Sequence, residues 1–176
     1  VTIGANITAS GFLMVDGGSG GVIQSPGTSI SVAGPTTVSV VAGSITLAQP
    51  GNDFSSIALT GDGVTVHDAN GLSFGPVNVS ASLALLTSGN VTQTAPMSVG
   101  GSATLDAGSG NVTLTTGGNN FGSLSVSGGA ISILASGSPL NVSSLASGPN
   151  QSVSLVTGSA LTLPGGAINT GSGDLT

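Results

Sequence analysis

The chain has 176 residues with no lysine, arginine or cysteine, and its six acidic residues are all aspartate. Only 3 % of the residues are charged and the formal net charge is −6, whereas about a quarter of an average globular domain is charged. A chain without basic side chains repels phosphates, which excludes nucleic acids and anionic membrane surfaces as partners. It also lacks disulfides and cysteine zinc ligands. We therefore expect no enzyme activity and no cofactor.

The mean hydropathy is +0.50, yet the longest apolar runs span only a few residues. A membrane-spanning helix needs ~18 consecutive apolar residues, so we expect a chain that does not span a membrane. Valine, isoleucine and leucine recur throughout, which argues against a disordered linker despite the 31 glycines. The chain starts at Val1 without a signal-peptide pattern. We expect residues 1–176 to be a single segment excised from a longer repetitive chain.

Apolar–polar–apolar triplets follow one another along the chain, separated by Gly, Ser, Asn or Pro. They occupy residues 45–47, 64–66, 72–74, 77–79, 97–99, 112–114, 124–126, 131–133, 153–155 and 161–163. Alternation with period two and β-branched enrichment predict short, half-buried strands. The outer members, such as Val64 and Val66, should face a core and the middle member Thr65 should face solvent. No glycine-free helical period is present, so helix content should be near zero.

An internal repeat then predicts how these strands are arranged. Residues 43–54 align with residues 110–121 at an offset of 67, residues 88–92 recur as 109–113 at an offset of 21, and 108–113 recur loosely as 171–176 at an offset of 63. Both longer offsets equal three units of about 21–22 residues, and each unit holds three short strands. This pattern predicts an all-β fold, a parallel β-helix (β-solenoid) of about eight coils. Phe54 and Phe121 should be equivalent inward residues at a corner, three coils apart.

Residues 51–75, 88–129 and 171–176 resemble the repeat region of filamentous haemagglutinin-like adhesins, the exoproteins of two-partner secretion systems in Gram-negative bacteria. The resemblance covers residues 36–176. It implies a right-handed parallel β-helix, export across the outer membrane and a role in adhesion. The secretion domain of that family is absent from these residues, and autotransporter passenger domains are a similar alternative.

Two motifs invite a catalytic or phosphate-binding interpretation. His67 and Asp68 are the only adjacent acid–base pair, but neighbouring strand residues face opposite sides, so they should not form a dyad. The glycine-rich residues 16–21 have no lysine and no following helix, so a turn is expected instead of a phosphate loop.

Aspartate and asparagine supply the remaining candidate sites. Asp53, Asp62 and Asp68 are close in sequence and leave a calcium site as an alternative to turn chemistry. Six Asn-x-Ser/Thr sequons make their asparagines possible glycosylation sites. These asparagines are Asn6, Asn78, Asn90, Asn111, Asn141 and Asn150.

The outward serines and threonines have three interpretations: a solvated strand face, a surface that contacts a glycan or protein, or an ice-binding array. Consecutive outward threonine pairs are scarce, with Thr92 and Thr94, and Thr113 and Thr115, which leaves ice binding as the weakest.

We expect a non-catalytic segment of a secreted or cell-surface bacterial adhesin or exoprotein, a rigid stalk that contacts a surface glycan or protein. The alternative is a subunit that assembles end to end into an extracellular filament, because strand edges template further pairing. A polysaccharide lyase, which has the same fold, ranks third because its basic or clustered acidic residues are missing.

Overall fold

The computed structural model describes residues 1–166 and 168–176, and within these residues every regular element is a β-strand. The strands are β1 (Thr2–Ile3), β2 (Ile7–Ala9), β3 (Leu13–Asp16), β4 (Val22–Gln24), β5 (Ile30–Ser39), β6 (Ile45–Leu47), β7 (Asp53–Asp68), β8 (Leu72–Thr87), β9 (Val91–Gln93), β10 (Met97–Asp106), β11 (Val112–Leu114), β12 (Asn120–Gly128), β13 (Ile131–Ala135), β14 (Leu140–Ser147), β15 (Val153–Thr157) and β16 (Leu161–Thr162). No helix long and apolar enough to cross a membrane occurs in the part of the chain that the structure describes.

The strands are parallel and stack as a β-solenoid of about eight turns, with about 21 residues per turn. One column of paired residues passes through eight successive rungs of what we call the rear face: Thr2, Ile23, Thr46, Thr65, Ala84, Thr104, Ser125 and Ser144. A second series, which we call the front face, pairs β3 with β5 and continues through β7, β8, β9, β11, β13 and β15. These findings confirm the predicted fold class.

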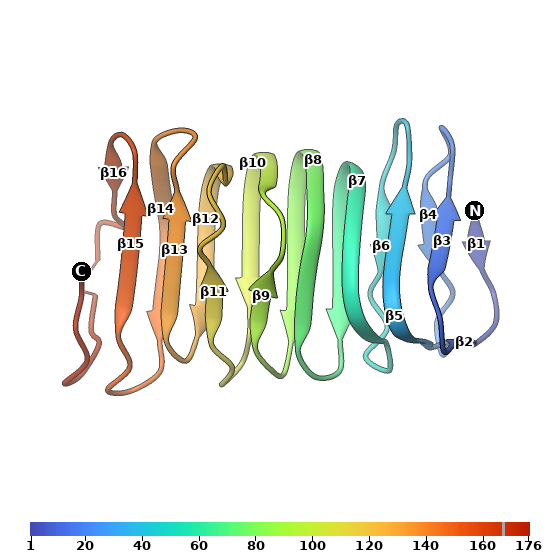
Figure 1. Ribbon diagram of the computed structural model, residues 1–176, viewed down its shortest axis with the longest axis horizontal. Coiled ribbons are helices and arrows are strands. Elements are labelled where there is room, and N and C mark those ends of the chain that lie inside the picture. The colour runs from blue at the N-terminus through green and yellow to red at the C-terminus, as the bar shows by residue number, and fades with distance from the viewer. Residues whose placement is uncertain (167) are drawn as a thin grey trace.

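The direction of the strands fixes the hand of the coil. In Figure 1, front strands such as β13 and β15 run upward, strands behind them run downward, and the chain advances from its N-terminus at the right to its C-terminus at the left. This is the sense of a right-handed solenoid.

The predicted inward and outward positions are also confirmed. Val64 and Val66 are buried, whereas Thr65 between them is exposed. The core is a single cluster of aliphatic residues with the phenylalanines Phe54, Phe74 and Phe121. Each coil buries its apolar side chains only against the coils next to it, so the core becomes continuous through stacking.

The predicted spacing of Phe54 and Phe121 is wrong, although both side chains are buried. Phe121 stacks through Val99 and Val79 on Gly61, which is three coils away. Gly61 lies seven residues after Phe54 in the same strand. Three coils here take only 60 residues, so seven residues of the 67-residue repeat remain. The repeat therefore advances three coils and one further side of the coil.

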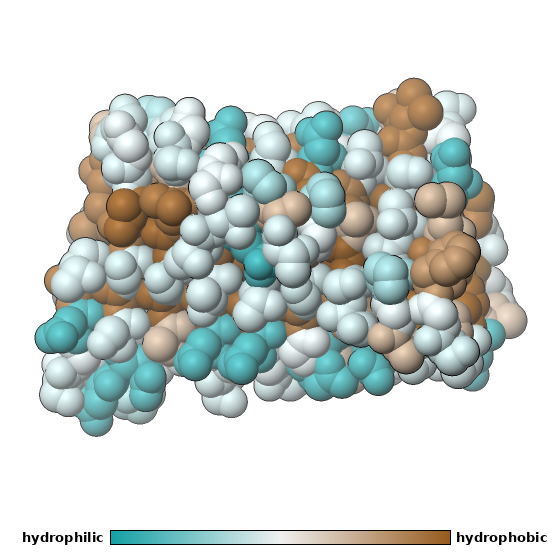
Figure 2. Space-filling view, viewed as in Figure 1, coloured by the Kyte–Doolittle hydropathy of each residue, from teal (hydrophilic) through white to brown (hydrophobic). Residues whose placement is uncertain are grey.

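Glycines allow neighbouring coils to approach at the corners. The register of β10 shifts between Val99 and Ser102, at Gly100–Gly101, and a Cβ on Gly101 would overlap the carbonyl oxygen of Ala81 in the preceding coil. Figure 2 shows that the viewed face is mostly pale, as expected for serine, threonine and glycine, with separate hydrophobic patches. The solenoid thus presents a largely neutral surface.

Candidate functional site

The main repetitive feature of the front face is a column of outward hydroxyl groups. Ser56, Ser73 and Thr92 occupy consecutive rungs, and the pairing of Val91 with Val112 continues the column to a second set of three residues. That set is Thr113, Ser132 and Ser154. We call these six residues the hydroxyl column. Parallel rungs are ~4.8 Å apart, so the column is a regular line of hydrogen-bond donors and acceptors.

The two threonine pairs noted in the sequence lie side by side on this face. Thr92 and Thr113 belong to adjacent rungs of the hydroxyl column, and Thr94 and Thr115 lie two residues later, directly after the ends of β9 and β11. All four side chains are exposed. The array is small, because the next two rungs carry apolar residues at the equivalent positions. Leu134 lies two residues after Ser132, and Val156 lies two residues after Ser154. A large flat threonine surface is therefore not formed here.

The asparagines of all six sequons are exposed. Several of them also connect coils at corners, a role that the sequence did not reveal. The Asn111 backbone N–H donates to Asn90 Oδ1 at 2.8 Å, and the Ala130 N–H donates to Asn111 Oδ1 at 2.9 Å. Asn6 and Asn150 accept equivalent bonds from Ser29 and Ser172, both at 2.9 Å. A sequon at these corners therefore has a structural explanation as well as a possible glycan.

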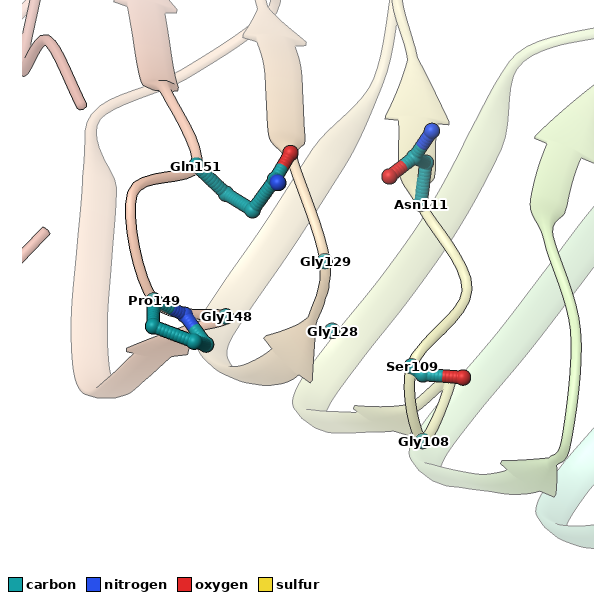
Figure 3. Close-up of a pocket in the computed structure, with 8 residues that line it drawn as sticks. All are labelled: Gly108, Ser109, Asn111, Gly128, Gly129, Gly148, Pro149 and Gln151. Carbon is teal, nitrogen blue, oxygen red and sulfur yellow. The ribbon is translucent and has the colours of Figure 1, made fainter.

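A hollow of about 510 Å³ lies at the corner that contains Asn111. Its walls are glycines of three successive turns together with Ser109, Pro149 and Gln151. Figure 3 shows the side chains of Asn111 and Gln151 reaching toward each other over Gly129. A Cβ on Gly129 would lie 2.6 Å from Asn111 Oδ1, so the close packing at this corner needs glycine. The hollow offers amide and hydroxyl groups and no charge.

A second, smaller hollow of about 310 Å³ lies on the rear face around His67. His67, Leu86 and Asp106 occupy three consecutive rungs there. Asp106 accepts hydrogen bonds from Ser127 Oγ at 2.9 Å and from the Gly108 N–H at 3.0 Å. His67 and Asp68 do face opposite sides, as predicted, because His67 is partly exposed and Asp68 is buried.

The three aspartates for which calcium binding was the alternative to turn chemistry have separate roles. Asp53 accepts a hydrogen bond from Asn70 Nδ2 at 3.0 Å, and Asp62 accepts bonds from the Gly43 N–H at 2.8 Å and Ser80 Oγ at 2.7 Å. No group of three His, Cys, Asp or Glu residues that could hold a metal ion occurs within residues 1–166 and 168–176. The sequence proximity of the aspartates thus reflects turns and corners.

The local surroundings shift the pKa values of two of these carboxyl groups in opposite directions. The hydrogen bonds from the Gly43 N–H and from Ser80 hold the pKa of Asp62 below its ordinary value. Burial raises the pKa of Asp68, although the N–H groups of Phe54 and Asn70, which donate at 2.8 and 3.1 Å, oppose this effect. Asp68 is therefore a buried acid bound by backbone donors.

The glycine-rich residues 16–21 form a turn, as expected. Asp16 Oδ1 accepts the Gly18 N–H at 2.9 Å, and Gly18 and Gly21 have φ angles of 55° and 77°. Left-handed φ angles of this kind favour glycine, which explains the composition of the segment.

Two amide pairs, one buried and one partly buried, were missed by the sequence interpretation. Gln24 and Asn52 are hydrogen-bonded in the core, and Gln93 with Asn119 repeats the pair. A signal was present, because glutamine ends the triplets 22–24 and 91–93 where other triplets end in an apolar residue.

Comparison with protein families gives one assignment. Residues 1–60 and 61–127 match a family described as repeats of unknown function (DUF5649). The chain belongs to this family. The two matched units meet between Thr60 and Gly61, inside β7, so the family repeat begins within a strand that continues around the coil. Searches of curated proteins and of solved structures found no match.

Proposed function

We propose that this chain is a non-catalytic segment of a secreted or cell-surface bacterial adhesin or exoprotein, in which it acts as a rigid stalk and a repetitive contact surface. The observation that carries the proposal is the hydroxyl column, which extends over six rungs of the front face. A line of evenly spaced hydroxyl groups without charge suits a neutral, hydroxyl-rich partner such as a surface glycan, or the backbone of a protein.

The solenoid architecture supports the stalk role. Each coil is bonded to the next by parallel pairing, for example over eleven paired positions between β7 and β8. Contacts between coils are local, so length can grow by adding repeats without a new core. The resemblance to filamentous haemagglutinin-like exoproteins supports export from a Gram-negative cell.

Cell attachment tests the contact surface directly. The purified chain is coupled to beads and retention on bacterial and mammalian cells is measured. Double substitution Thr92→Val and Thr113→Val removes two hydroxyl groups and keeps β-branched side chains. The matched control is Thr65→Val with Thr104→Val, two exposed threonines of the rear face.

We expect retention by the native chain, a loss of at least several-fold in the front-face variant and little change in the rear-face control. Beads that are not retained, or two variants that lose retention equally, would count against a front-face contact surface. Localisation is tested separately, with antibodies against intact producing cells. Labelling that appears only after lysis contradicts a surface location.

The alternative is a structural subunit that assembles end to end into an extracellular filament. Coils in the solenoid associate through backbone hydrogen bonds, and the same bonds could form between molecules. Electron microscopy of the purified chain separates the two proposals: long fibres favour the filament, and short rods favour the stalk.

A further inference from the structure

Asn70–Gly71 is the only Asn-Gly pair in the chain. It forms the corner between β7 and β8, and the Asn70 side chain is exposed to solvent. Asparagine followed by glycine is chemically labile, because no side chain shields the glycine nitrogen from the preceding carboxamide.

The two reacting groups are already side by side. The Gly71 backbone nitrogen lies 2.6 Å from Asn70 Oδ1, to which it donates a hydrogen bond. Attack of this nitrogen on Asn70 Cγ forms the carbon–nitrogen bond of a five-membered succinimide, and the bond from Cγ to Nδ2 breaks as ammonia leaves. Water then adds to either ring carbonyl and opens the ring. The products are aspartate and isoaspartate, and no oxidant or reductant is needed.

Other asparagines lack one or both conditions. Valine follows Asn78, Asn90 and Asn111, and its branched side chain crowds the attacking nitrogen. The buried asparagines Asn52 and Asn119 hold Nδ2 in hydrogen bonds inside the core. The reaction should therefore select Asn70.

We propose that Asn70 is a self-modification site, at which the Gly71 nitrogen converts the carboxamide into aspartate or isoaspartate. Asn70 Nδ2 donates to Asp53 Oδ1 at 3.0 Å, so the reaction replaces this hydrogen bond with two facing carboxylates. The same residue donates its N–H to the buried Asp68 and accepts a hydrogen bond from Thr87 Oγ1. Isoaspartate adds a methylene group to the main chain at this point and so disturbs both bonds.

Mass spectrometry of the intact chain, aged at mildly alkaline pH, tests the site. Trypsin has no cleavage site here, but cleavage before aspartate yields residues 68–105, which contain Asn70, Asn78 and Asn90. We expect Asn70 to change first, with release of ammonia. Isoaspartate leaves this fragment uncut and one mass unit heavier, whereas aspartate at position 70 adds a cleavage site and yields residues 70–105, also one mass unit heavier. Asn70→Gln should block the change. The reference rate is that of a free peptide of residues 68–73.

A folded-chain rate within about tenfold of the peptide rate, or faster, supports the proposal. A folded chain that reacts more slowly than this, or that changes at Asn78 or Asn90 as early as at Asn70, overturns it. The structural consequence is tested with Asn70→Asp, for which we expect a melting temperature lower by about 1–4 °C. An unchanged or higher melting temperature contradicts the role of the Asn70–Asp53 contact.

Discussion

Gln24 and Asn52 exchange two hydrogen bonds inside the core, from Gln24 Nε2 to Asn52 Oδ1 at 2.7 Å and from Asn52 Nδ2 to Gln24 Oε1 at 2.8 Å. Gln93 and Asn119 make the same two bonds at 2.9 and 2.8 Å. Each asparagine also accepts a backbone N–H of the preceding coil, from Ile30 or Met97, at 2.9 Å. Neutral amides thus connect coils where a charged pair would face a large desolvation cost.

Replacing Asn52 should destabilise the solenoid strongly. Asn52→Ala removes the partner of Gln24 Oε1, of the Ile30 N–H and of the Leu47 carbonyl, and each unsatisfied buried group costs about 1–3 kcal/mol. We expect a loss of about 2–4 kcal/mol in the free energy of unfolding, measured by urea denaturation. Asn78→Ala, at an exposed site, is the control and should change stability by less than ~0.5 kcal/mol. Equal effects of the two substitutions would refute this role.

Thr36 offers a stabilising substitution. Its side chain is 1 % exposed and its Oγ1 has no hydrogen-bond partner. Thr36→Val keeps the shape of the side chain and removes the buried hydroxyl, so stability should rise by about 1 kcal/mol. Thr37→Val changes the neighbouring outward residue and should have little effect. A decrease with Thr36→Val would indicate that the hydroxyl has an unrecognised partner.

Asp68 should make stability depend on pH. Its pKa is raised in the folded chain by burial, so the folded state favours the protonated acid. The contribution of Asp68 is then most favourable below the unfolded carboxyl pKa of ~3.9 and is lost as pH rises through the raised folded pKa. Asp62 has a lowered pKa and acts in the opposite direction, but its carboxyl group is open to solvent, so its effect is small.

Comparison with Asp68→Asn isolates this group. The free energy of unfolding is measured by urea denaturation from acidic to neutral pH for both proteins. We expect the free energy of unfolding of the native chain, relative to that of the variant, to fall as pH rises. The reason is that only the native chain retains the buried carboxylate. A difference that does not vary with pH would show that Asp68 does not titrate as its burial implies.

The corner glycines make a further prediction. Gly101→Ala places a Cβ against the Ala81 carbonyl oxygen, so we expect a loss of about 1–3 kcal/mol or misfolding. Gly75→Ala is the matched control in a strand, because its Cβ would meet Ala58 Cβ at 3.4 Å, an ordinary contact. Thermal melting of the two variants measures the difference. Similar melting temperatures would mean that the coils can separate at Gly101 without cost.

The sequence predicted which residues face the core and which face solvent better than it predicted where each repeat lies around the coil. Alternation at Val64, Thr65 and Val66 defines the inward and outward sides directly, since successive strand residues face opposite ways. The offset between Phe54 and Phe121 could not distinguish whole coils from coils plus one side, because the paired residues of neighbouring coils lie from 17 to 23 positions apart. Gln24 was missed because an inward polar residue is recognisable only once its partner, 28 residues away, is placed beside it.

The rotated repeat has a consequence for multivalent recognition. One repeat advances three coils and one side, which is a third of a coil. Three repeats therefore advance ten coils and bring a given feature back to the same side, ~48 Å further along the rod at ~4.8 Å per coil. Any array of these repeats would therefore display each motif along a slow spiral. A flat partner could engage every third copy, whereas a partner that winds around the rod could engage all of them.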